Sequence, residues 1–329
     1  MAQSNTAQQW DQSDLLYGRL VLCSGTANPD LAAQIASYVD VELHPCEIRQ
    51  FANSNTFMKL GRSVRGCDVF WIQPTSAPAN DNLMELLIAI DMLRRDSAGR
   101  ITAVVPYYGY GRSDKKDQPR VPISARLVAD MITTAGADRV LMMDLHAGQI
   151  QGFFTIPVDD ITAQHMLADW VCEQGIEKGV VLSPDLGRAK DARNFAERVD
   201  MPLALIEKRR SRDGGSTEAL NLIGEVEGCD VVIIDEEIDT AGTMVRAAKF
   251  AKASGAKRVY ALATHPIFSD PATERMREAG FERIVVTNTV PIPPEKRMPN
   301  IEVLDVGPLL GEVIRRIHTG RSVGEMFNE

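Results

Sequence analysis

The chain has 329 residues and a formal net charge of −9 at pH 7, with 44% hydrophobic and 25% charged residues. These proportions are typical of a globular protein with a real core, and the length is sufficient for two domains of ordinary size. The acidic balance argues against nucleic acid as a partner, because nucleic-acid binding depends on a basic face. Small anionic substrates stay open, since a few local Arg and Lys residues can set the sign of a cleft.

The cysteines indicate a reducing compartment. Their number, five, is odd and no two form a CxxC pair, so we expect reduced thiols, a cytoplasmic location and no thiolate metal site. No apolar stretch approaches the length of a membrane span, and residues 1–16 lack the basic and apolar pattern of a secretion signal. We therefore expect residues 1–16 to be a flexible leader and predict no membrane partner.

Short apolar runs alternate along the chain with helical patterns. Strands are predicted at residues 19–25, 67–73, 100–108, 139–145, 179–185, 202–208, 230–236 and 258–265. Helices are predicted at residues 82–99, 124–136, 189–199 and 243–255, the last of which ends at Gly255. This alternation predicts the α/β class, with mainly parallel sheets that are flanked by helices on both faces.

The two halves of the chain resemble each other. The stretch GCDVFWIQ from Gly66 aligns with GCDVVIID from Gly228, and LVLCSGTANPDLAA aligns with VVLSPDLGRAKDAR. Both matches have an offset of roughly 160 residues, which indicates a duplicated domain rather than a solenoid. Chance similarity of two α/β segments is the alternative, but two collinear matches at one offset argue against it. We predict domains at residues 17–162 and 163–305.

The clearest chemical motif is VVIIDEEIDTAGT, residues 231–243. Its β-branched residues form a buried strand, and an acidic turn follows that opens a helix at Thr243. Small residues in this turn let backbone N–H groups face an anion at the helix N-terminus. Asp235 and Glu236 stand at the carboxyl end of the strand, where open α/β sheets place their ligands. The motif suits a sugar phosphate; a solvated N-cap is the alternative, but it needs one acid and not four.

This loop resembles the phosphoribosyl-binding loop of type I phosphoribosyltransferases and ribose-phosphate pyrophosphokinases. Segments such as YYGYGRSDKKDQPRVPISARLVADM, DLHAGQIQGFFTIPVDDITA and THPIFSDPA look like the pyrophosphokinases, and the likeness runs from Gly18 to Phe327. The resemblance implies two duplicated phosphoribosyltransferase-like domains, with residues 306–329 packed back on the first. It assigns ribose 5-phosphate binding to Asp235, Glu236, Asp239, Thr240, Ala241, Gly242 and Thr243.

The resemblance also implies a reaction. The β,γ-pyrophosphoryl group of Mg²⁺–ATP would move to the 1-hydroxyl of ribose 5-phosphate, giving 5-phosphoribosyl 1-pyrophosphate and AMP. The product would supply nucleotide, histidine and tryptophan biosynthesis. The implied partners are ATP and ribose 5-phosphate, and the implied cofactor is Mg²⁺ carried by ATP.

The expected ATP contacts come from three segments. Arg112 opens the charged loop RSDKKDQPR and can donate paired N–H groups to phosphate oxygens. By resemblance Arg112, Ser113 and Asp117 contact ATP, with Ser113 where many relatives have Gln. A lone histidine is more often structural, and His44, His165 and His318 are read so. The resemblance instead assigns His146 to ATP and, with Asp185, to Mg²⁺, which takes few protein ligands.

Lys208 and Arg210 are the predicted catalytic residues. They stand two apart on an extended segment and hence on one face, before SRDGGSTE, a polar stretch that reads as a mobile lid. By resemblance this pair stabilises the transition state; a solvated basic strand end is the alternative. Phe51, Asn53 and Asn55 resemble the adenine-side segment, which in relatives comes from a neighbouring subunit. A homo-oligomer is therefore expected, and the resemblance favours a hexamer.

The chain departs from the family pattern at three further places. Ser54-Asn55 stand where most relatives carry Gly-Glu, Glu236 stands where they carry a second Asp, and Arg188 stands where many have Gly. The changes at Asn55 and Glu236 keep a different class of function open, a non-catalytic relative that binds an active synthetase and regulates it, whereas Arg188 is read as compatible with activity. A phosphoribosyltransferase is the other alternative, but it predicts one α/β domain with a base-binding hood.

Overall fold

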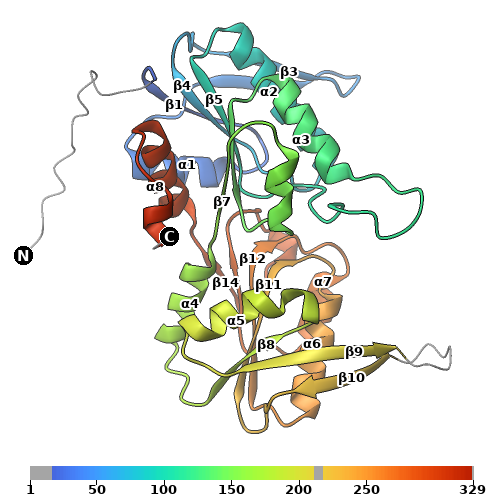
Figure 1. The fold of residues 1–329 in the computed structure, drawn as a ribbon. Coiled ribbons are helices and arrows are strands. Elements are labelled where there is room, and N and C mark those ends of the chain that lie inside the picture. Colours follow the sequence, from blue (N-terminus) through green and yellow to red (C-terminus); the bar gives the residue numbers. More distant parts are fainter. Residues whose placement is uncertain (1–16, 211–217, 328–329) are drawn as a thin grey trace, which may run out of the picture.

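The computed structural model describes residues 17–210 and 218–327, and for residues 208–210 and 218–220 it describes the backbone alone. Figure 1 shows two α/β halves that follow each other along the chain, the first blue to green and the second yellow to orange. Each half has its own sheet, and the strands of one sheet do not mix with those of the other. The predicted α/β class is confirmed.

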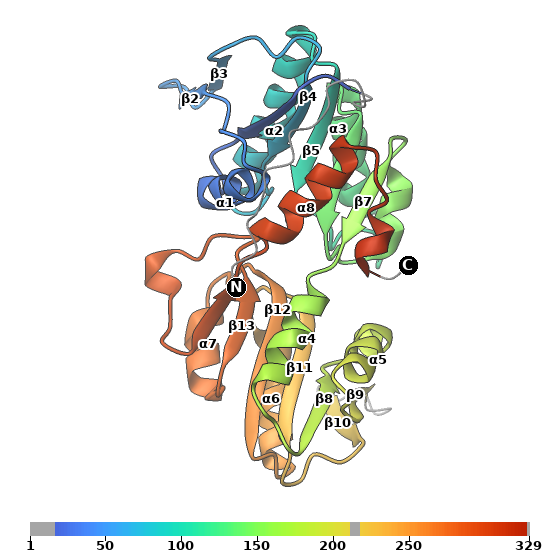
Figure 2. The ribbon, with the colours of Figure 1, turned by 90° about the vertical axis from the view of Figure 1, so that its left-hand side faces the viewer.

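The first sheet is parallel throughout. Its strands run in the order β1-β4-β5-β6-β7. Their bounds are β1 Leu20–Ser24, β4 Asp68–Ile72, β5 Arg100–Val105, β6 Arg139–Met143 and β7 Val158–Ile161. The antiparallel hairpin of β2 (Cys46–Gln50) and β3 (Thr56–Leu60) forms a separate small sheet. In Figure 2 this hairpin projects from the end of the first half that is remote from the second.

Helices cover both faces of the first sheet because successive strand residues point to opposite sides. Val69 and Trp71 pack with α2 (Ala79–Arg95) and α3 (Ser124–Ala135). Phe70 and Ile72 pack instead with α1 (Pro29–Val39) and α8 (Gly307–His318). Helix α8 contacts α1 although it comes from the far end of the chain, as Figure 1 shows in red beside blue.

The second sheet repeats this plan with an added pair of strands. Its order is β10-β9-β8-β11-β12-β13-β14, parallel except for β10 against β9. The strands are β8 Gly179–Ser183, β9 Leu203–Arg210, β10 Glu218–Ile223, β11 Asp230–Ile238, β12 Arg258–Pro266, β13 Ile284–Thr287 and β14 Ile301–Leu304. One face carries α6 (Gly242–Ala253) and α7 (Ala272–Ala279), and the other carries α4 (Gln164–Glu173) and α5 (Ala189–Arg198).

Several predicted boundaries are wrong; for example, the helix predicted to end at Gly255 ends at Ala253. The strand predicted to end at residue 236 continues to Ile238, so the turn is shorter than the acidic motif suggested. Ile238 is buried and its carbonyl accepts from the Phe268 N–H at 2.9 Å, which extends β11 along β12. The helix predicted at 82–99 begins at Ala79 and ends at Arg95, before Ser97 takes a left-handed conformation with φ 63°.

A buried charge cluster fastens α8 to the first sheet. Asp68 accepts from Arg100 Nε at 2.8 Å and Nη2 at 2.6 Å, and His318 Nδ1 lies 2.7 Å from the same Oδ2 that accepts from Nη2. The Asp68 side chain is 0% exposed and that of Arg100 only 10%. Arg100 Nη2 also donates to the carbonyl of Ile317. His318, which the sequence left structural, is therefore a structural residue.

Asp68→Ala should lower the free energy of unfolding by about 3–5 kcal/mol, because it leaves buried Arg100 without its counter-ion. Denaturant unfolding followed by circular dichroism measures the change. The control is Asp91→Ala, which removes an exposed pair with Arg95 and should change stability little. Equal, small shifts in both variants would contradict the structural role of the buried cluster.

Candidate active site

The candidate site lies where the carboxyl ends of the two sheets face each other, the edge at which open α/β sheets bind ligands. His146, just beyond β6, places Nδ1 2.5 Å from Glu236 Oε1 at the end of β11. Arg112 Nη1 donates to Asp239 Oδ2 at 2.8 Å. The same region holds a small cavity of about 10 Å³, whose lining includes Arg112, His146, Glu237 and His265. Both halves of the chain therefore build this site.

Three consecutive carboxylates lie near the end of β11, just before Ile238. Asp235, Glu236 and Glu237 are each partly buried. Burial raises the pKa of Asp235 to about 6 and also raises the pKa of Glu237. Glu237 lies 3.5 Å from Arg112 Nε and accepts from the Tyr107 hydroxyl at 3.4 Å. The row thus faces cations and donors that come from the other half of the chain.

Arg188 is the cation nearest to this row. It ends the short helix Leu186–Arg188 that follows β8, and its side chain is 19% exposed. The guanidinium forms an ion pair with Glu236 through Nη2, lies 3.5 Å from Asp235 through Nε and donates to Asp191 at 2.9 Å. The departure noted at position 188 thus brings a charged side chain into the site.

The imidazole of His146 is suited to bind a metal ion or a proton in its neutral form. Burial, and next the Arg188 cation, lower its pKa below the ordinary histidine value. When Nδ1–H donates to Glu236, Nε2 keeps its lone pair for a metal ion or a substrate proton. Asp185, the other predicted metal residue, accepts from the N–H groups of Gly187 and Arg188 and so caps the short helix.

The loop predicted to bind phosphate leads into an uncapped helix. Ala241 has φ 59° and is the N-cap of α6, and no side chain accepts from the first turn. The helix begins at Gly242, one residue before the predicted start at Thr243. The N–H groups of its first turn have no intrahelical partner, which makes them donors for an anion. Arg275 Nη1 donates to the carbonyl of Thr240 at 3.0 Å and fixes the loop.

The other predicted residues lie further out. Ser113 is half-buried at the start of the charged loop, where its N–H donates to the Tyr110 carbonyl, and Asp117 is exposed in that loop. Lys208 and Arg210 belong to β9, in register with β10, but their side chains lie outside the described residues. The predicted lid at 211–218 lies outside the described residues but for Glu218, whose backbone begins β10.

The adenine-side residues form the tip of the β2–β3 hairpin. Phe51 is 45% exposed, the Asn55 carbonyl accepts from its N–H, and Asn53 accepts from the Asn55 N–H. The Arg49 guanidinium stacks 4.7 Å from the Phe51 ring centroid. Within the described chain no hydrogen bond or ring contact joins this tip to the other site residues, and Figure 2 shows the hairpin apart from the second half.

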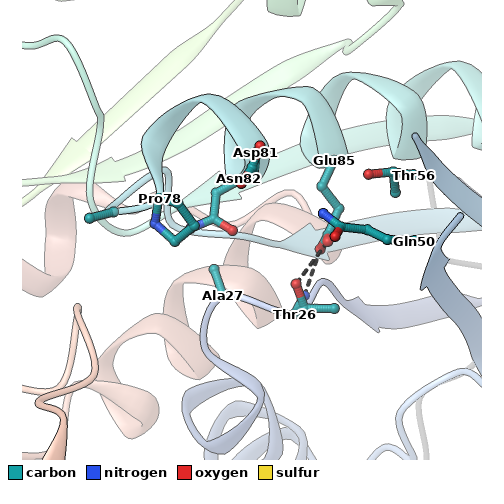
Figure 3. Close-up of a pocket in the computed structure, with 9 residues that line it drawn as sticks. Thr26, Ala27, Gln50, Thr56, Pro78, Asp81, Asn82 and Glu85 are labelled. Atoms are coloured by element: carbon teal, nitrogen blue, oxygen red, sulfur yellow. Dashed lines mark hydrogen bonds between the residues drawn. The ribbon is translucent and has the colours of Figure 1, made fainter. Parts of the chain in front are cut away.

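A larger cavity, of about 260 Å³, lies in the first half at the ends of β1 and β4. Figure 3 shows Glu85 at its wall, where it accepts from the Thr26 N–H and hydroxyl. Its lining is Thr26, Ala27, Gln50, Thr56, Ala77, Pro78, Asp81, Asn82 and Glu85. These residues include two carboxylates and no Lys, Arg or His, so phosphate groups do not suit this cavity.

Sequence reasoning missed three contributors. Glu237 faces Arg112 and accepts from the Tyr107 hydroxyl. Buried His265 packs 5.1 Å from the Tyr107 ring and bonds to the Met143 carbonyl at 3.0 Å. Glu237 was visible as the third acid of DEE, and His265 as the histidine of THP. Their importance depends on contacts between residues more than a hundred positions apart, which no local pattern shows.

Residues 17–210 and 218–327 include no group of three or more His, Cys, Asp or Glu residues that could hold a metal ion. No helix in the described chain is long and apolar enough to cross a membrane.

Two family models match the chain. The N-terminal domain of ribose phosphate pyrophosphokinase matches residues 20–136, and the phosphoribosyl synthetase-associated domain matches residues 216–328. The chain is 47% identical to the ribose-phosphate pyrophosphokinase of Gloeobacter violaceus, over 94% of this chain and 93% of that one. It is 48% identical to that of Prochlorococcus marinus, over 98% of both.

A solved structure agrees with these relatives. The crystal structure of phosphoribosylpyrophosphate synthetase from Mycobacterium smegmatis superposes with a TM-score of 0.87 at 46% identity. The superposition covers 91% of this chain and 98% of that one.

The titration of Asp235 should appear in the pH dependence of stability. Its pKa is higher in the folded state than the ordinary 3.8, so the folded protein binds the proton more tightly and loses stability as pH rises through about 6. Relative to Asp235→Asn, the wild-type protein should lose about 2 kcal/mol between pH 4 and 7.

Denaturant midpoints measured for both proteins across this range test the prediction. Asp160, whose pKa is raised to about 7 by burial and by Asp144, titrates in both proteins and cancels in the difference. A difference that stays constant with pH would contradict the raised pKa of Asp235.

Proposed function

Because the chain belongs to the ribose-phosphate pyrophosphokinase family, we propose that it transfers the β,γ-pyrophosphoryl group of Mg²⁺–ATP to the 1-hydroxyl of ribose 5-phosphate. The products are 5-phosphoribosyl 1-pyrophosphate and AMP. The observation that carries this proposal is the pair of contacts between the halves, His146 with Glu236 and Arg112 with Asp239. They join the residues assigned to ATP with those assigned to the sugar phosphate, as a transfer between two substrates requires.

Ribose 5-phosphate binds at the end of β11. The 5-phosphate accepts from the N–H groups and hydroxyls of residues 239–243, at the uncapped start of α6. Asp235 and Glu236 accept from the ribose hydroxyls. The ion pair of Arg188 with Glu236 keeps this carboxylate charged. The sugar is thereby held with its 1-hydroxyl toward the first half of the chain.

ATP occupies the first-half side of the site. Arg112 donates to phosphate oxygens in a fork once it leaves Asp239. Mg²⁺ carried by the nucleotide would supply neutralisation of the phosphate charge. His146 and Asp185 are the residues that would hold it: His146 is neutral with Nε2 unused by Glu236, and Asp185 carries an oxygen beyond the one that caps its helix. Such sparse ligation suits Mg²⁺, which keeps several waters.

Lys208 and Arg210 supply positive charge to the pyrophosphoryl group in the transition state. Their support is the family resemblance, together with their two-residue spacing in the sequence, which predicts one face for both on an extended segment. Charge that is already in place stabilises the group as its bond to AMP breaks. When Lys208 and Arg210 close over the pyrophosphoryl group, they also exclude water and so suppress hydrolysis of ATP.

A regulatory, non-catalytic subunit is the second candidate, favoured by the departures at Asn55 and Glu236. AMP formation from ATP and Mg²⁺, with and without ribose 5-phosphate, separates the two. Sugar-dependent AMP together with the pyrophosphorylated sugar supports the enzyme. Folded protein that binds ATP but forms no AMP supports the regulatory subunit.

We also propose a cytoplasmic location and the domain division at residues 162 and 163. Cys23, Cys67 and Cys229 are buried free thiols, which suit a reducing compartment. The chain passes from β7 of the first sheet to α4 of the second half at this point, which supports the division.

Lys208→Ala should lower kcat by about two orders of magnitude while ATP affinity changes less than about threefold, because the lost charge acts on the transition state. Steady-state kinetics and ATP binding by calorimetry give the two quantities. Lys249→Ala, on the exposed side of α6, is the control. Equal losses in kcat and in ATP affinity would assign Lys208 to substrate binding instead.

Variants at the tip of the β2–β3 hairpin test whether two subunits of an oligomer share one active site. If Phe51 of one subunit stacks on adenine in its neighbour, Phe51→Ala and Lys208→Ala damage different sites in a mixed oligomer. Each variant alone should be nearly inactive, and co-refolded mixtures should recover part of the wild-type activity. Mixtures that form mixed oligomers by native mass spectrometry yet recover no activity would place Phe51 in its own subunit's site.

A further inference from the structure

Arg188 holds the carboxylates of the candidate site together. Its guanidinium is shared by Glu236, Asp235 and Asp191. Glu236 in turn uses its second oxygen for His146. The side chain of Arg188 is 19% exposed and that of Glu236 is 8% exposed, so both charges are largely removed from water. Arg188 follows β8, Glu236 lies near the end of β11 and His146 follows β6. The contacts of Arg188 and His146 with Glu236 therefore join three separate parts of the chain.

Without this side chain the site would be a cluster of like charges. Burial is the main cause that raises the pKa of Asp235, and Arg188 is the strongest influence that lowers it. Asp185, which follows β8, raises it further, as a nearby negative charge does. Partly buried carboxylates that lie near one another require a compensating cation. Proteins supply either a basic side chain or a metal ion for this purpose.

The guanidinium occupies the position that a cation between these carboxylates would take. It contacts Glu236 Oε2, whereas His146 contacts Oε1, and its Nε lies 3.5 Å from Asp235. Its planar fork gives fixed donors to carboxylate oxygens. The described residues also lack a group of three acids or histidines open to a metal ion.

We propose that Arg188 is a built-in cation that takes the place of a divalent metal ion at the sugar-binding carboxylates, and that it positions Asp235 and Glu236 for the ribose hydroxyls. Resting on the proposed function, this inference names a positioning residue of the same site. The sugar then binds to preformed carboxylates without a metal ion of its own. Metal dependence is confined to the ion that ATP carries.

The test measures metal binding without any substrate. Mn²⁺ is titrated into the full-length wild-type protein and into Arg188→Gln, with free Mn²⁺ followed by electron paramagnetic resonance. Gln keeps much of the size but removes the charge. We expect Arg188→Gln to gain one Mn²⁺ site per chain, at least about tenfold tighter than any site of the wild-type protein. Arg188→Gln/Glu236→Gln should lose that site.

Two matched variants separate charge from packing. Arg188→Lys keeps the cation and should bind Mn²⁺ as the wild-type protein does. Lys190→Gln removes an exposed charge two residues away and should also leave binding unchanged. If Arg188→Gln binds Mn²⁺ with the number and affinity of the wild-type protein, the proposal is overturned.

Folding is measured on the same samples. Arg188→Gln should melt at a lower temperature than the wild-type protein, and Mn²⁺ should restore its melting temperature while leaving that of the wild-type protein nearly unchanged. A variant that stays unfolded with and without Mn²⁺ would show that a divalent ion cannot replace the guanidinium, which also overturns the proposal. Absence of AMP formation in the wild-type protein would contradict the proposed function but leaves these readouts intact.

Discussion

The Glu236 carboxylate is the contact on which the rest of the site depends. His146 reaches it from beyond the first sheet, and Arg188 reaches it from the second half. Because it is largely buried, its charge must be compensated by neighbours and not by water. The two sheets are therefore held with their carboxyl ends facing, which is the arrangement that lets two substrates meet. Buried His265 supports the same junction by bonding to Thr289 and to the Met143 carbonyl.

The duplicated halves have divided the chemistry between them. In the second half, the strand–turn–helix unit of β11 and α6 kept an uncapped helix start with donors for an anion. In the first half, the corresponding unit of β4 and α2 borders a cavity lined by carboxylates, amides and hydroxyls. On the proposed function, the second half binds the sugar phosphate once, and its copy contributes Arg112 and His146 from other strands.

The two hairpins extend this division. The β2–β3 hairpin lies between α1 and β4, and the β9–β10 pair lies between α5 and β11, so both occupy the same place in the repeat. The first carries the residues assigned to adenine, and the second carries Lys208 and Arg210. Added pairs of strands at a sheet margin change length and direction at little cost to the core, which suits them to carry function.

The sequence by itself determined the α/β class, the duplication, the family and most strands, because alternation of apolar runs and the motif at 231–243 are local properties of the chain. It also predicted a role for Asp235 and Glu236 from their residue type and their place at the end of a strand. Only the tertiary structure decided that β11 continues to Ile238, that Arg188 enters the carboxylate row, and that Glu237 lies between Arg112 and the Tyr107 hydroxyl. Those outcomes depend on burial and on contacts between distant residues, since a side chain's charge environment is set by what packs around it and not by its neighbours in sequence.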